Sequence, residues 1–223
     1  MATVQMVHFS DVLCVWAYIA QIRMDELAHE FGDDLSIEYK FISVFGSARE
    51  KLERRWASEG GLSAYNAHVQ RVASEFKHVV VHPEVWTRVA PRSSWPAHLV
   101  LCAIRILERK GVVAPGSLRA ITWAVRTAFF QDLVDVSNQE ALLALVERLG
   151  VSPTAVTEVL GCGAAHAELS TDLEFARDQE ARVSPSVTLN EGRQRLNGNV
   201  GYRVIAANVR EILERPQEMK SWC

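Results

Sequence analysis

The chain has 223 residues, of which 48% are hydrophobic, and a formal net charge of −3. This is enough for a sizeable core, in one large domain or in a domain with an insertion. The charge balance argues against a nucleic-acid partner, and the chain has no run of about 18 apolar residues that could cross a membrane. The first residues also lack the basic and apolar regions of a secretion signal, so we expect a cytoplasmic protein.

The N-terminal segment predicts two strands around one helix. The run VQMVHF (4–9) is short and apolar, which indicates a buried strand. Residues 14–32 then repeat apolar side chains every three to five positions and end at Gly32, as a helix with a glycine C-cap does. The run LSIEYKFISV (35–44) alternates like a second strand. Together they predict a βαβ unit with a right-handed crossover.

The middle of the chain, residues 47–180, reads as mostly helical. Ser94 is the expected cap of one helix, and Ser137 or Asn138 the expected cap of a later one. The exception is FKHVVVHPEVW (76–86), where three consecutive valines and a proline indicate an extended loop or an edge strand.

The strand pattern returns near the C-terminus. The run PSVTLN (185–190) is β-rich, EGRQRLNG reads as a tight turn with another short strand, and a helix follows that ends at Pro216. The predicted architecture is therefore α/β, a βαβ–ββα domain with a large all-helical insertion. We assign residues 1–60 and 181–223 to the α/β domain and residues 61–180 to the insertion.

The four cysteines have no CxxC or other regular spacing, so neither a disulfide framework nor a metal site is expected. Cys14 stands where the first strand gives way to the first helix. There the free N–H groups of the first turn and the helix dipole stabilise a thiolate. Such positions lower the pKa of a cysteine from about 8.5 to roughly 3.5–7.5. We therefore expect Cys14 to be a nucleophile with a lowered pKa; the alternative is a buried small hydrophobic residue.

A second candidate element is RVSPSVTLN (182–190), in which Pro185 begins a strand and removes one donor from its ladder. A cis Ser184–Pro185 bond would turn the preceding backbone groups outward as a docking edge. From the local sequence alone, an ordinary trans proline is favoured.

These segments together resemble one family. FSDVLCVWAYIA (9–20) resembles the active-site segment of DsbA-like thioredoxin-fold proteins, typically D-x-x-C-P-W-C-Y, and VSPSVTLN resembles their cis-proline loop and third strand. LNGNVGYRVIAANVREIL resembles their closing segment. PRSSWPAHLVLCAI and AVRTAFFQDLVDVSNQEALLALVERLG resemble the helical insertion of the cytoplasmic FrnE-like branch, which is related to 2-hydroxychromene-2-carboxylate isomerases and kappa-class glutathione transferases. The resemblance implies a thioredoxin-like fold with a helical insertion.

The departures from the family pattern bear on the chemistry. The proline after the first cysteine is Val15 here, and the second, resolving cysteine is Ala17. The isomerase and kappa-class branch has a serine where Cys14 stands. A nucleophilic cysteine without the resolving cysteine implies a monothiol mechanism. In such a mechanism the mixed disulfide is resolved by an outside thiol such as glutathione.

The resemblance therefore implies a thiol–disulfide oxidoreductase with Cys14 as nucleophile and no covalently bound cofactor. Its partner would be glutathione, acting as co-substrate, or a cysteine-containing peptide or protein, and a homodimer is compatible with the family. First-turn N–H groups would support the thiolate, a tryptophan would line the site, and the proline corner would dock the substrate backbone. The residues in these roles are Val15, Trp16, Ala17, Ser184 and Pro185. Cys102, Cys162 and Cys223 include no clear resolving thiol.

Two other functions stay open. Glutathione bound near Cys14 could serve transfer or isomerisation of a small electrophile, with an apolar acceptor pocket in the helical insertion. The aromatic residues that could line it are Trp95, Trp123, Phe129 and Phe130. Alternatively, loss of the resolving cysteine marks a non-catalytic binding module.

Overall fold

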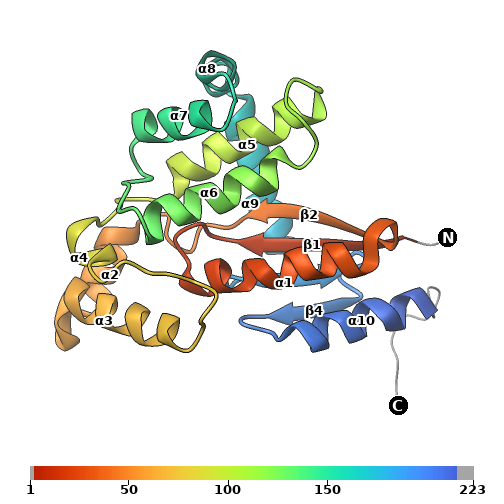
Figure 1. Cartoon of the computed structure of the whole chain (residues 1–223), viewed down its shortest axis with the longest axis horizontal. Helices are drawn as coiled ribbons and strands as arrows, with labels where there is room; N and C mark the ends of the chain where they lie inside the picture. Colours follow the sequence, from red (N-terminus) through yellow and green to blue (C-terminus); the bar gives the residue numbers. More distant parts are fainter. Residues whose placement is uncertain (1–2, 215–223) are drawn as a thin grey trace.

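The computed structural model of the protein describes residues 3–214 and is built around a four-stranded mixed sheet (Figure 1). Its strands are β1 (Val4–Ser10), β2 (Leu35–Phe41), β3 (Ser186–Leu189) and β4 (Gln194–Asn197). The sheet order is β2-β1-β3-β4; β1 is parallel to β2, and the other two pairs are antiparallel. The sheet therefore joins the first part of the chain to a segment near its other end.

β1 is an inner strand, which explains why its sequence is apolar. Val4, Met6 and Phe9 are almost completely buried, because strands cover both edges of β1 and helices cover both faces. In the register, Phe9 lies opposite Ser186 of β3. The end of β1 is thereby held next to the start of β3, although 170 or more residues separate them in the chain.

α1 (Val15–Phe31) and α10 (Tyr202–Glu214) lie along one face of the sheet (Figure 1). They enclose a core that includes buried apolar residues of β1, β3 and both helices. α1 ends at Gly32, whose φ of 49° is accessible to glycine at little cost. A short 3₁₀ helix, Gly32–Asp34, then leads into β2.

All the remaining helices lie between β2 and β3 in the chain. α2, α3 and α4 stand beyond the N-terminal end of α1, and α5 to α9 form a helical block beside the sheet (Figure 1). α9 reaches back to contact β2. Their bounds are α2 Ala48–Arg55, 3₁₀ Ala57–Glu59, α3 Gly61–Ser74, α4 Val85–Arg88, α5 Trp95–Arg109, α6 Ser117–Phe130, α7 Gln139–Arg148, α8 Pro153–Gly161 and α9 Ala164–Asp178.

A buried ion network ties the helical block to the sheet. Asp172 of α9 accepts two hydrogen bonds from the guanidinium of Arg105 on α5, at 2.8 and 2.7 Å. It also accepts from the Lys40 ammonium at 3.3 Å and from the backbone N–H of Phe41 at 3.0 Å, both on β2. Asp172 is 1% exposed, so its charge is compensated almost wholly by these donors.

Three predicted elements differ in detail. The second strand ends at Phe41, before the predicted position 44, and residues 76–84 form a loop with turns that leads into α4. Ser94 occupies the N-cap position of α5 without capping it, because its hydroxyl donates to Asp11 at 2.9 Å. At α7 the cap is Asn138, whose side chain accepts from the first-turn N–H groups. The predicted stop at Pro216 lies outside the described residues.

Candidate functional site

Cys14 lies at the junction of β1 and α1, in the N-cap position of the helix. Its backbone is extended, with φ −84° and ψ 116°, and its carbonyl accepts the first helical hydrogen bond from Tyr18 at 3.0 Å. Its own N–H donates to the Asp11 carbonyl at 3.1 Å, which closes a tight turn between strand and helix. The sulfur therefore stands at the positive end of a 17-residue helix.

Ser184 contacts Cys14, and Pro185 follows Ser184 directly in the chain. The Cys14 thiol lies 3.2 Å from the Ser184 carbonyl oxygen. The Ser184 hydroxyl accepts a hydrogen bond from the Asp11 N–H at 2.9 Å. The Ser184–Pro185 bond is cis. The pairing of β1 with β3 brings these two distant segments together, so the contact is a product of the sheet and not of local sequence.

Asp11, for which the sequence predicted no role, holds the Cys14 turn in place through its carboxylate. Its side chain is fully buried. Oδ1 accepts the Leu13 N–H at 3.0 Å, and Oδ2 accepts the Phe45 N–H at 2.8 Å and the Ser94 hydroxyl at 2.9 Å. Asp11 thus joins the Cys14 turn to the chain after β2 and to the start of α5. The aspartate of the D-x-x-C pattern was the signal that could have marked it.

Two buried basic side chains lie close to the same turn. Nε2 of His98, on α5, accepts the Val12 N–H at 3.3 Å, and burial lowers the pKa of this imidazole. Arg126, on α6, is fully buried and donates to Gln21 at 2.6 Å and to Ser10 at 2.8 Å. Burial lowers the pKa of Arg126 to about 10, still well above neutrality. The helical block therefore supplies a neutral hydrogen-bond acceptor from α5 and a cation from α6, both next to the residues that precede Cys14.

The predicted lowering of the Cys14 pKa is wrong for this structure. Cys14 is only 6% exposed, and burial, which disfavours the charged form, raises the pKa of its thiol. A hydrogen bond with Ser184 and the N–H groups of Ala17 and Trp16 favour the thiolate, whereas the charge of Asp11 disfavours it further. Desolvation outweighs the helix terminus, so the thiol is protonated at neutral pH.

The three residues after Cys14 lie on different faces of α1 and therefore differ in exposure. Val15 and Ala17 are buried, so only their backbone groups can serve the site. Trp16 is half-buried and packs edge-to-face on Phe76 of the loop after α3, with ring centroids 6.1 Å apart. Of these three side chains, Trp16 is the one that is not buried.

The other cysteines are placed differently. Cys102 on α5 is completely buried, and burial raises its pKa to about 12. Cys162 is exposed and forms the C-cap of α8, a helix that lies at the top of the helical block and away from the start of α1 (Figure 1). Cys14, Cys102 and Cys162 are all free thiols. Cys223 lies outside the described residues.

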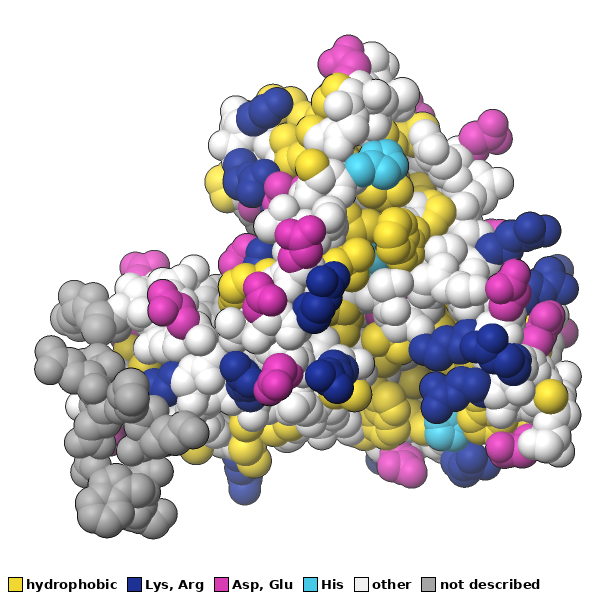
Figure 2. All heavy atoms as spheres, turned by 180° about the vertical axis from the view of Figure 1, so that it is seen from behind, with side chains coloured by type: hydrophobic (Ala, Val, Ile, Leu, Met, Phe, Trp, Pro, Cys, Tyr) yellow, Lys and Arg dark blue, Asp and Glu magenta, His cyan; other side chains and the backbone are white. Residues whose placement is uncertain are grey.

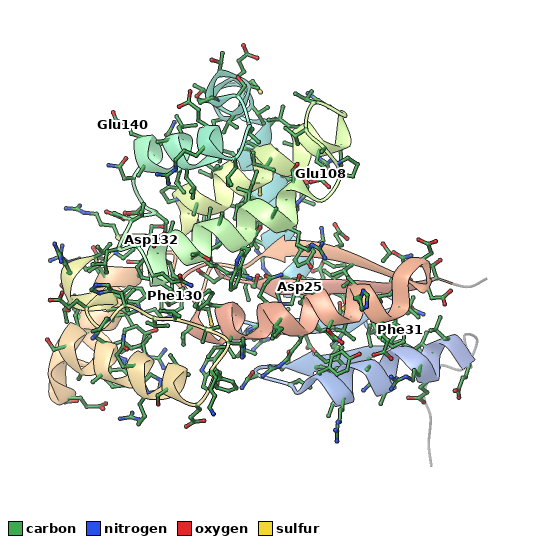
Figure 3. The ribbon with its side chains drawn as sticks, in the orientation of Figure 1. Asp25, Phe31, Glu108, Phe130, Asp132 and Glu140 are labelled. Atoms are coloured by element: carbon green, nitrogen blue, oxygen red, sulfur yellow. The ribbon has the colours of Figure 1, made fainter. Side chains whose placement is uncertain are left out.

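The proposed acceptor pocket is not supported for two of its four aromatic residues. Phe129 and Phe130 are fully buried core residues. Figure 3 shows Phe130 at the end of α6 nearest α1, where its ring stacks on Tyr18 at 4.8 Å. Trp123 also stacks on Tyr18, with ring centroids 5.0 Å apart, and is 36% exposed. Trp95 is 40% exposed, and its indole N–H donates to Ser43 at 2.7 Å.

Two further properties concern the described residues as a whole. Within residues 3–214, no group of three or more His, Cys, Asp or Glu side chains is arranged to hold a metal ion. None of the helices in this part of the chain combines the length and apolar character needed to cross a bilayer.

Several solved structures have a fold similar to that of this chain. The chain is similar in structure to a probable DsbA oxidoreductase from Streptomyces coelicolor, at 18% identity and a TM-score of 0.74, covering 98% of this chain and 94% of that one. It is also similar to the cytosolic disulfide reductase DsbM from Pseudomonas aeruginosa, at 17% identity and a TM-score of 0.65, covering 95% and 98%. A third similar structure is a 2-hydroxychromene-2-carboxylate isomerase, at 17% identity and a TM-score of 0.64, covering 97% and 100%.

These structural likenesses establish the fold. A search of curated proteins gave no significant match. The sequence model of the DSBA-like thioredoxin domain matches residues 5–210, nearly the whole chain, and its span includes both the Cys14 turn and the Ser184–Pro185 corner. The chain therefore belongs to the DSBA-like thioredoxin domain family.

Proposed function

We propose that the protein is a monothiol thiol–disulfide oxidoreductase that uses glutathione as co-substrate. The observation that carries this proposal is the contact of the Cys14 thiol with the Ser184 carbonyl at 3.2 Å, at the N-terminus of α1. Ala17 occupies the position of the second cysteine and is buried, so the first turn of α1 offers no resolving thiol.

The reaction is two successive thiol–disulfide exchanges. The Cys14 thiolate attacks the glutathione sulfur of a glutathionylated peptide; a disulfide forms between Cys14 and glutathione, and the peptide leaves as a thiolate that takes up a proton. A second glutathione thiolate then attacks this mixed disulfide. Glutathione disulfide forms and Cys14 is released. One glutathionylated peptide and one glutathione thus become a peptide thiol and glutathione disulfide.

The residues around Cys14 have separate tasks in this scheme. The main chain of Ser184 faces the sulfur and docks the peptide or glutathione backbone beside the reacting atom. The N–H groups of Trp16 and Ala17 stabilise the thiolate once it forms. Because burial raises the Cys14 pKa, exchange requires loss of the thiol proton and runs faster as the pH rises.

The comparisons support glutathione and a cytoplasmic location. The DsbM protein of similar fold is described as a cytosolic disulfide reductase and has also been solved with GSH. A reducing cytosol supplies the outside thiol that a single-cysteine site needs.

The test is exchange with a glutathionylated peptide, followed by mass spectrometry of the protein. We expect the wild type to carry one glutathione on Cys14 and to release the peptide thiol. Cys14→Ser should abolish both, because an alcohol cannot form the mixed disulfide. Cys162→Ser, which removes an exposed cysteine away from the site, is the matched control and should retain both. Equal turnover by the wild type and Cys14→Ser would refute the proposal.

A second candidate is a non-catalytic binding module, and the burial and raised pKa of Cys14 favour it. In that case the wild type would bind the glutathionylated peptide without any exchange, at every pH from neutral to above the Cys14 pKa. The rate of exchange therefore separates the two functions. It rises with pH for an oxidoreductase and is zero at every pH for a binding module.

A further inference from the structure

A cleft of about 340 Å³ opens between α2 and α3. Phe45, Trp56 and Tyr65 form aromatic walls, and Lys51 and Arg55 are the cations that line it. Figure 2 shows Lys and Arg side chains gathered on the end of the molecule that α2 forms. In Figure 1 this end lies beyond the N-terminus of α1.

The cleft is connected to the Cys14 site through a short chain of bonds. Phe45 lines the cleft, and its N–H donates to Asp11 at 2.8 Å, three residues before Cys14. Lys51 donates to the carbonyl of Val44, the residue before Phe45. Cys14, Phe45 and Tyr65 also belong to one hydrophobic cluster. A ligand in the cleft therefore lies against Phe45, whose backbone is hydrogen-bonded to the Cys14 turn.

The two cations lie on one helix without a paired carboxylate among the described residues. Lys51 and Arg55 are four residues apart on α2 and form no ion pair within residues 3–214. The carboxylates of α2 are engaged elsewhere: Glu53 pairs with Arg49 at 3.0 Å, and Glu50 accepts from Ser47 at 3.1 Å. Like charges at this helical spacing repel. A bound anion would relieve this repulsion.

The Tyr65 hydroxyl and the charge balance of the cleft also suit a ligand that carries both a carboxylate and a sulfur atom. The Tyr65 hydroxyl forms no hydrogen bond within residues 3–214, which leaves a neutral donor free. The charges of Cys14 and Asp11 add to burial in raising the pKa of Tyr65, so its ring lies within electrostatic reach of the Cys14 turn. Glu59 also lines the cleft, so one negative charge stands against two positive ones.

We propose that this cleft binds a carboxylate of a low-molecular-weight thiol substrate, held by Lys51 and Arg55 while the sulfur of that substrate meets Cys14. This inference rests on the proposed function and narrows its substrate to thiols and disulfides that carry a carboxylate. Lys51 supplies a point charge with rotatable donors, and Arg55 a planar donor pair that matches the two oxygens of a carboxylate.

The test uses S-methylglutathione, which has no free thiol and cannot exchange, and its diethyl ester, whose carboxylates are blocked. Binding to the full chain is measured by calorimetry. We expect Lys51→Met to weaken binding of the acid about tenfold or more, since a charge-assisted hydrogen bond is lost. Lys51→Arg should restore most of the affinity. Arg54→Met, on the same helix outside the cleft, should bind within about twofold of the wild type.

The ester separates this inference from the proposed function. The wild type should bind the ester about tenfold or more weakly than the acid, and this preference for the acid should be smaller in Lys51→Met, which keeps only Arg55. Equal binding of acid and ester by the wild type, unchanged binding by Lys51→Met, or no binding of the acid at all overturns the carboxylate site. Exchange with glutathione disulfide and with its tetraethyl ester at equal rates also overturns it, yet leaves Cys14 chemistry intact. If neither disulfide is exchanged, the proposed function is refuted but the carboxylate site is not.

Discussion

At the scale of the residue, the acidity of Cys14 is a balance between a helix terminus and a buried environment. The N–H groups of the first turn favour the thiolate, but burial and the charge of Asp11 favour the thiol, and the pKa is raised overall. Asp11 is nevertheless needed for the conformation of the turn, because its carboxylate accepts three hydrogen bonds there. The geometry of the site is thus maintained at some cost to the reactivity of its thiol.

Asp11→Asn tests this balance. The substitution removes a negative charge from the neighbourhood of Cys14, so the Cys14 pKa should fall, as measured by the pH dependence of alkylation with iodoacetamide. The amide keeps only one acceptor oxygen, and the free energy of unfolding should drop by about 1–3 kcal/mol. A Cys14 pKa that stays the same or rises would show that Asp11 acts on the thiol only through structure.

At the scale of the element, the helical block and the sheet are joined by the network around Asp172. This carboxylate connects α9 to α5 through Arg105 and to β2 through Lys40 and the Phe41 N–H. Three separate elements therefore share one buried charge. Removal of that charge leaves two largely buried cations with one more exposed carboxylate each, Glu168 for Arg105 and Glu38 for Lys40. This is less favourable than loss of an exposed ion pair.

Asp172→Ala should lower the free energy of unfolding by about 3–5 kcal/mol, measured by denaturant titration. Glu53→Ala is the matched control, because it breaks the exposed pair with Arg49 on α2. That change should cost less than about 1 kcal/mol, since water screens the pair. Similar losses in the two variants would mean that the buried network adds no stability beyond that of a surface pair.

At the scale of the whole molecule, the buried histidines make stability depend on pH. His8 on β1 is 1% exposed, its ring nitrogens have no hydrogen-bond partner among the described residues, and burial, with the charge of Arg126, lowers its pKa to about 3. The pKa of the buried His98 is lowered too. In the unfolded chain both rings take up a proton near pH 6.5. Stability is therefore complete above this pH and is lost as the pH falls from about 6.5 toward 3.

His8→Leu checks this coupling. The wild type should lose stability on acidification by up to about 1.4 kcal/mol per pH unit through His8, and the variant should lack this part of the slope. The measurement is the free energy of unfolding from pH 7.5 to 4. His29→Leu, on the exposed side of α1, should keep the wild-type slope. Parallel curves for His8→Leu and the wild type would contradict the assignment.

Local sequence was sufficient for the elements and for the position of Cys14. A short apolar run, a helical repeat closed by Gly32 and an alternating run predicted β1, α1 and β2, and the lone cysteine at their junction marked the candidate nucleophile. The β-rich run after Pro185 predicted β3. These features depend on backbone periodicity and on which residues end a helix, and both are legible along the chain.

The tertiary structure alone decided the character of the site. The pairing of Phe9 with Ser186 sets Ser184 against the sulfur, and the packing of distant segments around the Cys14 turn buries the thiol and raises its pKa. The cations of the cleft between α2 and α3 come from α2, whose charge pattern looks like an ordinary exposed helix in sequence. Desolvation and charge pairing depend on which distant segments come into contact, and no local pattern contains that information.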